Sequence, residues 1–314
     1  MIEKLRDIIR VNGGFANCHS HLDRSNTIYR SDFSKTKNHL FEKWKIVDDI
    51  KRESSVTKIL NNINESLSSQ KKFGVSKIIS FIDIDSVVGT KAIDAAEMAK
   101  EFAKEIGIDL KIACQTLKGV VSKEERSLFY SNIERFDIIG GLPKADNDSE
   151  KHIDILFDVA KQTGKKVHVH VDQLNTKKEK ETELLALKTI KYGLEGSVVA
   201  VHSISLACHE KKYRNYVYKL CKDSGMSFIA CPSAWIDSPR TEELSVTHNA
   251  TTPIDELIKN NIPVALGSDN IHDIYKPYSD GDMMFELRLA LESNKVYDLK
   301  DIVNIACNNY KYIA

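Results

Sequence analysis

Two histidines near the amino terminus, His19 and His21, have a spacing that suits metal binding. They belong to the stretch NCHSHLD (residues 17–23), which follows a short apolar run. Side chains alternate along an extended strand, so imidazoles at i and i+2 point to the same side. Two neutral imidazoles on one face suit Zn²⁺ or Fe²⁺. A solvated or capping pair of histidines has the same spacing, so the pattern needs partners elsewhere in the chain.

Polar residues near the ends of later apolar runs supply these partners. Singly, each has an ordinary structural explanation, such as a hydrogen bond to the scaffold or a cap on the next helix. Together, on separate strands whose carboxyl ends meet at one face, they predict an active site. These later residues are Asp83, Gln115, His168, His170, His202 and Asp269.

The donor types predict a mononuclear metal site. His19, His21, His170 and Asp269 are the expected ligands of one divalent ion, which lowers the pKa of a bound water and so supplies hydroxide. Asp269 is also placed to take a proton from the water, and His202 to bind the water or polarise the substrate. The fourth predicted strand ends in Gly140-Gly141 and has no lysine there. A second metal ion bridged by a carbamylated lysine is therefore not expected.

His168 shares a face with His170, one pleat deeper in the same predicted strand. We expect it to support the site or the core, and a ligand role is the alternative.

The overall composition excludes several classes of function. The 314 residues carry 45 Lys plus Arg and 45 Asp plus Glu, so no basic surface argues for nucleic acid. No apolar run approaches the roughly 20 residues of a membrane span, and the amino terminus is no signal peptide. The six scattered cysteines contain no CxxC pair and are typical of a reduced, cytoplasmic protein.

Short β-rich runs alternate with amphipathic helical segments over most of the chain, which indicates a parallel sheet. Eight expected strands predict an α/β fold of the (β/α)8 TIM-barrel type, in a single domain spanning residues 1–314. We expect one long helical excursion over residues 34–70, between the first two strands. The expected strands lie around residues 15–21, 75–83, 110–115, 137–141, 166–171, 197–202, 226–230 and 264–267.

In its motifs and their order, the chain resembles the amidohydrolase superfamily and, within it, the cytosine deaminase branch. The motifs occur in order over nearly the whole chain: HSHLD (19–23), LFE (40–42), ACQ (113–115), VHVDQ (169–173), VHS (201–203) and LGSDN (266–270). The resemblance implies a metal-dependent hydrolase whose ligands are His19, His21, His170 and Asp269. It further implies that His202 assists the hydrolytic water and that Gln115 binds a substrate heterocycle.

Two departures from the family pattern qualify this expectation. The deaminases carry a proton-shuttling glutamate three residues after the fifth-strand histidine, where this chain has Gln173. An amide has no titratable proton near neutral pH, so Gln173 can only orient a substrate, and Asp172 or Asp269 is a candidate replacement. In addition, the small β-sandwich of most members is expected to be absent or reduced.

Further pocket candidates have equally ordinary explanations. Trp235 could cover a planar ring or simply pack, and Asn270, Asp172 and Asp83 could bind substrate or hold a loop. Two other histidines (His248, His272) are expected to be solvated or capping. Two cysteines next to the site (Cys18, Cys114) lack a nearby base and are poor nucleophiles.

The sequence therefore predicts a Zn²⁺- or Fe²⁺-dependent hydrolase that attacks an sp² carbon of a small nitrogen heterocycle, cyclic amide or amidine, with deamination as the first choice. One alternative is a hydrolase with another leaving group, such as a halide, an alkylamine or a ring amide, which Gln173 favours. A second is a catalytically silent barrel that binds a ligand. Homo-oligomerisation is left open.

Overall fold

The computed structural model describes all residues except 1, 29–34, 39 and 235–250. In these described residues all eight strands are parallel to their neighbours, as the sequence predicts. The strands are β1 Phe15–Ser20, β2 Val75–Asp83, β3 Asp109–Gln115, β4 Ile139–Gly141, β5 Val167–Val171, β6 Val198–His202, β7 Ser227–Ala230 and β8 Val264–Leu266.

The strands form two sheets, β1-β2-β3 and β4 to β8 in chain order, which two isolated parallel bridges join. Ala113 pairs with Ile138 between β3 and β4, and Ser20 pairs with Asp269 between β1 and the end of β8. The order of neighbours therefore runs through all eight strands and back to the first. All described strands belong to these two sheets, so the described residues contain no separate β-sandwich.

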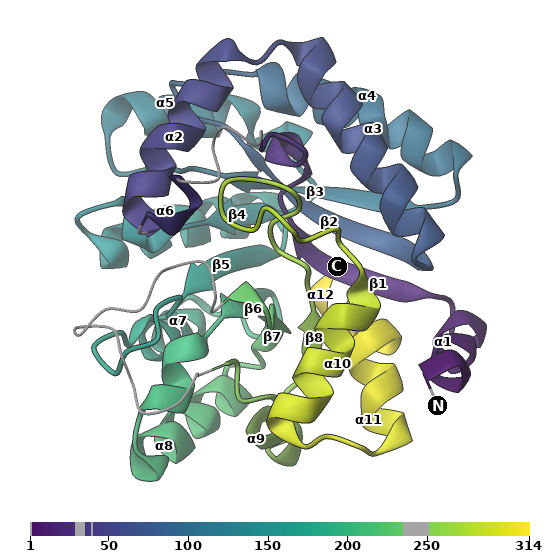
Figure 1. Ribbon diagram of the computed structural model, residues 1–314. Helices are drawn as coiled ribbons and strands as arrows, with labels where there is room; N and C mark the ends of the chain where they lie inside the picture. The colour runs from purple at the N-terminus through teal and green to yellow at the C-terminus, as the bar shows by residue number, and fades with distance from the viewer. Residues whose placement is uncertain (1, 29–34, 39, 235–250) are drawn as a thin grey trace.

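Helices follow the strands and cover their outer faces (Figure 1). None of the described helices is long and apolar enough to cross a membrane. The main helices are α1 Ile2–Val11, α2 Leu40–Glu53, α3 Val56–Lys72, α4 Lys91–Glu105, α5 Lys123–Asn132, α6 Ser149–Thr163, α7 Glu181–Tyr192, α8 Lys211–Asp223, α9 Ile254–Lys259, α10 Met283–Asn294, α11 Leu299–Val303 and α12 Tyr310–Ile313.

The excursion between β1 and β2 differs from the expected single helical stretch. It contains a short 3-10 turn (Lys35–Lys37) and two helices, α2 and α3, separated by Ser54 and Ser55. The Ser55 side chain accepts a hydrogen bond from the Lys58 amide and so caps α3. Both helices lie at the top of the molecule in Figure 1, on the same side as α4.

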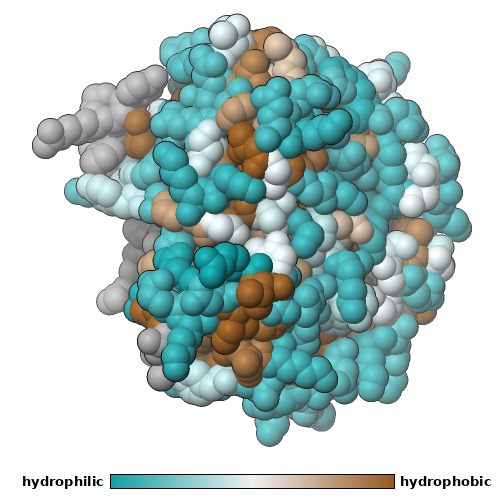
Figure 2. Space-filling view, turned by 90° about the vertical axis from the view of Figure 1, so that its right-hand side faces the viewer, coloured by the Kyte–Doolittle hydropathy of each residue, from teal (hydrophilic) through white to brown (hydrophobic). Residues whose placement is uncertain are grey.

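Alternate side chains along the strands separate two hydrophobic clusters. Residues such as Val169, Phe228 and Val264 face the surrounding helices. The intervening positions, including Ile79 and Val201, form a second buried cluster with Ile313 of α12. This second cluster fills the space that the strands enclose. The outer surface differs: the face in Figure 2 is mostly hydrophilic, with hydrophobic side chains gathered in small areas.

Gly140 marks where β4 meets β3. A Cβ atom at this position would lie 1.8 Å from the Cys114 carbonyl oxygen. Only glycine allows so close an approach of the two strands. The end of β4 therefore has no room for a side chain at Gly140.

Candidate active site

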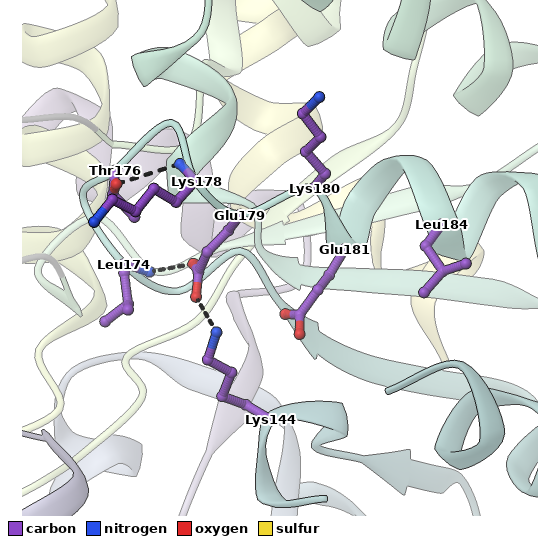
Figure 3. A pocket seen from close by; sticks show the side chains of 8 residues that line it. All are labelled: Lys144, Leu174, Thr176, Lys178, Glu179, Lys180, Glu181 and Leu184. Atoms are coloured by element: carbon purple, nitrogen blue, oxygen red, sulfur yellow. Dashed lines mark hydrogen bonds and ion pairs between the residues drawn. The ribbon is translucent and has the colours of Figure 1, made fainter. Parts of the chain in front are cut away.

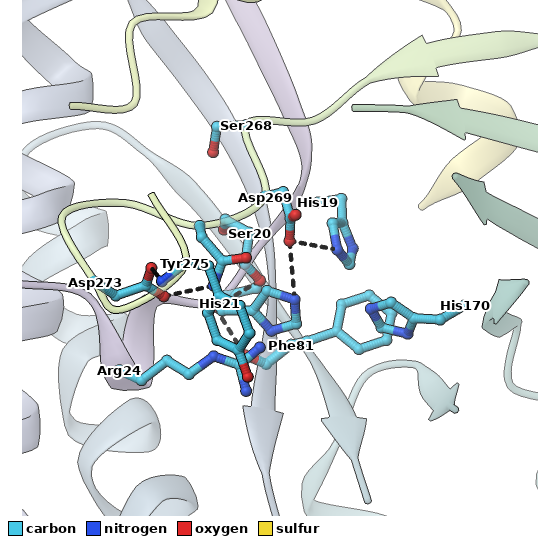
Figure 4. Close-up of polar contacts among 12 residues, drawn as sticks. His19, Ser20, His21, Arg24, Phe81, His170, Ser268, Asp269, Asp273 and Tyr275 are labelled. Carbon is cyan, nitrogen blue, oxygen red and sulfur yellow. Dashed lines mark hydrogen bonds and ion pairs between the residues drawn. The ribbon is translucent and has the colours of Figure 1, made fainter. Parts of the chain in front are cut away.

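His19 and His21 meet Asp269 where the last strand lies beside the first. The Nε2 atoms of His19 and His21 lie 3.3 Å and 3.2 Å from Asp269 Oδ1 (Figure 4). The Asp269 amide donates to the His19 carbonyl at 3.0 Å. A Cβ on Gly267 would lie 2.6 Å from the His19 Cβ, so glycine is required for this approach.

Two further histidines complete the group. His170 lies in β5 and His202 ends β6; their ring centroids are 4.8 Å and 5.3 Å from that of His19. The candidate ligand atoms of His19, His170 and His202 lie within 4.8 Å of one another, as do those of His19, His21 and Asp269. We call these five side chains, His19, His21, His170, His202 and Asp269, the histidine–aspartate cluster.

The hydrogen bonds of His170 leave one ring nitrogen available. Its Nδ1 lies 3.0 Å from the Gly141 carbonyl oxygen, which can only accept, so Nδ1 carries the proton and Nε2 keeps a lone pair. Neither this Nε2 nor His202 Nδ1 has a hydrogen-bond partner among the described residues, although both atoms are buried. A ligand histidine that donates its other N–H to a carbonyl is the usual arrangement in metal sites.

Burial sets the charges of the cluster. It lowers the pKa of His19, His21 and His170, and it lowers the pKa of His202 to about 3. Burial alone would raise the pKa of Asp269, but the contacts with His19 and His21 outweigh it and hold that pKa well below its usual range. Neutral imidazoles around a carboxylate are a donor set that suits Zn²⁺ or Fe²⁺.

Comparison with known proteins agrees with this geometry. The model of the Amidohydrolase family matches residues 11–310. The chain belongs to the amidohydrolase family. It is therefore an enzyme that hydrolyses carbon–nitrogen bonds, as the sequence predicts, in a family that depends on metal ions. The identity and the number of the ions stay predictions.

Two relatives and one solved structure are similar to this amidohydrolase. It is 43% identical to an uncharacterized protein of Haemophilus influenzae over 265 residues, 81% of this chain and 94% of the relative. It is 29% identical to the N-isopropylammelide isopropyl amidohydrolase of Pseudomonas sp. (strain ADP) over 304 residues, 91% of this chain and 70% of the relative. A 5-methylcytosine deaminase structure from Klebsiella pneumoniae superposes with a TM-score of 0.87 at 23% identity, covering 96% of this chain and 74% of that one.

Phe81 is a member of the amidohydrolase site that the sequence analysis missed. Its ring centroid lies 4.7 Å from those of His19 and His170 in edge-on contacts. The signal was available, because Phe81 lies two residues before Asp83 along β2 and therefore points to the same, inner face. Its ring therefore packs against both imidazoles.

His168 lies deeper in β5, as expected of a supporting residue. Its Nε2 donates to the Ile313 carbonyl at 2.9 Å, which ties the strand to α12. His168 belongs to neither candidate ligand group among the described residues.

The predicted substrate-binding residues have different surroundings. Gln115 ends β3, is 3% exposed, and its Oε1 has no hydrogen-bond partner among the described residues. Asn270 donates to Asp273 at 2.5 Å, and Asp83 pairs with Arg24 at 3.2 Å and with Lys51 at 2.9 Å.

Asp172 and Gln173 lie two and three residues after His170. Gln173 is half-buried, whereas Asp172 is buried and caps α7. The Asp172 carboxylate accepts from the Glu181 amide at 2.7 Å and from the Thr182 amide at 3.0 Å. Trp235 and His248 lie outside the described residues.

The other candidates have structural contacts. Burial raises the pKa of the Cys18 thiol and raises that of Cys114 to about 12, so neither forms a thiolate readily. His272 Nδ1 donates to the Pro277 carbonyl at 3.1 Å. These observations agree with the expectation that the two cysteines are poor nucleophiles and that His272 takes no part in the chemistry.

A cavity of about 400 Å³ lies beside the segment between β5 and α7 (Figure 3). Its lining includes Glu179, which pairs with Lys144 at 3.0 Å, and Glu181. Burial, followed by the neighbouring charges of Asp172 and Glu179, raises the pKa of Glu181 to about 7. No member of the histidine–aspartate cluster is among the described residues that line it, so this cavity is separate from the candidate metal centre.

Proposed function

We propose that this amidohydrolase uses one divalent cation, Zn²⁺ or Fe²⁺, to hydrolyse a small nitrogen heterocycle, cyclic amide or amidine at an sp² carbon, with deamination as the first choice. The observation that carries the proposal is the histidine–aspartate cluster, in which residues in or just after four strands bring their ligand atoms within 4.8 Å in two overlapping groups. His19, His21, His170 and Asp269 would hold the ion. When bound, such an ion acidifies water and polarises an sp² carbon for attack.

The surroundings of the cluster support a single ion. A binuclear site bridged by a carbamylated lysine would need a lysine at the end of the fourth strand, and this strand ends in Gly140 and Gly141. A side chain at Gly140 would collide with the Cys114 carbonyl oxygen at 1.8 Å. A bridging lysine at that position is therefore excluded sterically.

The roles of the protein side chains follow from their chemistry. Asp269 is the base that takes a proton from the attacking water, and His202 binds that water or the substrate from the adjacent strand. Gln115 offers its unpartnered Oε1 to an N–H of the heterocycle. Gln173 orients the substrate by hydrogen bonds but cannot carry a proton.

A second leaving group follows from Gln173 and from the Pseudomonas relative. That protein is named as an N-isopropylammelide isopropyl amidohydrolase. An alkylamine is therefore the main alternative to ammonia, and a halide the next. A silent binding barrel has less support, because a site without chemistry has no physical reason to keep four ligand side chains together.

The test is product release by protein of verified metal content. We expect ammonia or an alkylamine from at least one compound in a panel of aminopyrimidines, aminotriazines, aminopurines, their N-alkyl forms and cyclic amidines. His170→Ala should lose both metal and activity. His209→Ala is the matched control, because His209 Nε2 donates to the Glu179 carbonyl at 2.9 Å, outside the cluster.

The outcomes separate the alternatives. Ammonia supports deamination, and an amine or a halide as the product supports the second candidate. No product from metal-loaded protein, together with unchanged metal content in His170→Ala, would contradict the proposed function.

A further inference from the structure

Ser268 immediately precedes the cluster residue Asp269, and side chains bind all of its polar groups. Its amide donates to Asn17 Oδ1 at 3.0 Å, and its hydroxyl accepts from Asn17 Nδ2 at 2.8 Å. Its carbonyl accepts from Lys276 Nζ at 2.6 Å. Asn17 is itself held, because its Nδ2 also donates to Gln70 Oε1 at 2.6 Å. Asn17 and Lys276 together therefore fix the orientation of the Ser268 backbone, immediately before Asp269.

Asp269 needs this support because its backbone is unusual. Its φ is +58°, in the left-handed region that non-glycine residues rarely adopt. Such a conformation persists only where the surroundings over-determine it. It aims the carboxylate at His19 and His21, and Figure 4 shows Ser268 on the same loop as Asp269, with its side chain apart from this contact. A change in the Ser268 carbonyl would therefore move a candidate metal ligand.

Lys276 connects the Ser268 carbonyl to two other elements. Only 4% of it is exposed, and its Nζ also donates to Ser233 Oγ at 3.0 Å, just beyond β7. The Ser233 hydroxyl donates in turn to Glu286 of α10 at 2.5 Å. The Lys276 amide donates to Asp273 Oδ1 at 3.1 Å, which holds the turn that presents the side chain. Lys276 thus links the ends of β7 and β8 to α10.

We propose that Lys276 is a positioning residue: by binding the Ser268 carbonyl, it holds the Asp269 carboxylate in the geometry that binds the metal ion. The inference rests on the proposed metal centre and adds to it a residue outside the ligand set. Outer partners of metal ligands typically contribute 10- to 100-fold to metal affinity or activity. A lysine that only stabilised the fold would change the melting temperature and leave metal affinity unchanged.

The experiment measures Co²⁺ and Zn²⁺ dissociation constants of the metal-free 314-residue chain. For Lys276→Met we expect both constants to rise about 10- to 100-fold and the visible Co²⁺ spectrum to change. Lys188→Met is the matched control, because Lys188 is equally buried at 4% but pairs with Asp154 and Glu150 on the outer helices. It should bind both ions as the wild type does.

Lys276→Arg provides the second variant. It keeps the charge, but its larger planar head cannot replace a compact ammonium in a closed site, so we expect at least a fivefold weaker metal affinity. Wild-type affinity in either folded Lys276 variant, or an equal loss in Lys188→Met, would overturn the inference. If the wild type binds neither ion, the proposed metal-dependent function fails instead.

Discussion

Gln173 is the residue that raises the main chemical question about this enzyme, namely how a proton reaches the leaving group. It lies three residues after His170, and its amide cannot relay a proton. The neighbouring carboxylates already have hydrogen-bond or ion-pair partners. Asp172 accepts two amide hydrogen bonds from α7, and Glu179 pairs with Lys144. The expectation that Asp172 could replace the shuttle therefore loses support. Asp269 and the choice of leaving group become the more important factors.

Gln173→Glu tests this conclusion. If proton delivery limits deamination, a carboxyl at this position should raise ammonia release from an aminoheterocycle by about 10-fold or more, within the range of general acid–base catalysis. The measurement is the steady-state rate of ammonia release. Asn175→Asp adds the same charge two residues along and should have no such effect. Equal rates for the wild type and Gln173→Glu would show that protonation of the leaving group is not limiting.

The raised pKa of Glu181 predicts a pH dependence of stability. A carboxyl whose pKa rises from its usual value to about 7 on folding binds more protons in the folded state between about pH 4.5 and 7. Its contribution to stability is therefore lost as the pH rises through that window. Glu181→Gln should flatten the fall in melting temperature from pH 5 to 8. An identical slope in the variant would contradict this assignment.

At the scale of elements, helix α2 is attached to the end of β2 through buried charges. Lys51 of α2 lies 2.9 Å from Asp83 and 2.5 Å from Asp85, and Arg24 pairs with Asp83 at 3.2 Å. These contacts join α2, β2 and the turn after β1 beside the histidines. Asp83, a predicted substrate contact, is thus engaged in holding the helix that covers this edge.

Lys51→Met should be strongly destabilising. Removing one partner from a buried ion pair leaves uncompensated charge, here on Asp85, while Asp83 keeps Arg24 as its partner, and typically costs about 3–5 kcal/mol. Urea unfolding at neutral pH measures the change. Lys45→Met alters an exposed lysine on the same helix and should stay within about 0.5 kcal/mol of the wild type. A loss below about 1 kcal/mol for Lys51→Met would show that these charges contribute little to docking α2.

At the scale of the whole molecule, the candidate metal centre coincides with the junction between the first and last strands. His19 and Asp269 are 250 positions apart, and Ser20 pairs with Asp269 across the same junction. An ion held there would connect the two ends of the strand order. Metal binding should therefore stabilise the native state, which contains the assembled site, over the unfolded chain.

Removal of the metal should lower the melting temperature. A ligand at 100 times its dissociation constant stabilises a native protein by about 2.7 kcal/mol, which corresponds to a shift of about 5 °C for a large domain. Thermal unfolding with added Zn²⁺ and with a chelator measures the shift. His170→Ala should show a much smaller difference between the two conditions. A melting temperature that did not depend on metal would contradict a folded-state metal site.

The sequence by itself determined the alternation of strands and helices, because hydrophobic periodicity and turn residues are local properties. It also identified the members of the cluster by their type and order. Tertiary structure decided how three of them, His19, His202 and Asp269, are directed into the cluster. A register irregularity in β1 lies between Asn17 and Ser20, and left-handed backbone occurs at His202 (φ +75°) and Asp269. Periodicity cannot predict such departures, because they depend on contacts with distant strands and on residues such as Lys276.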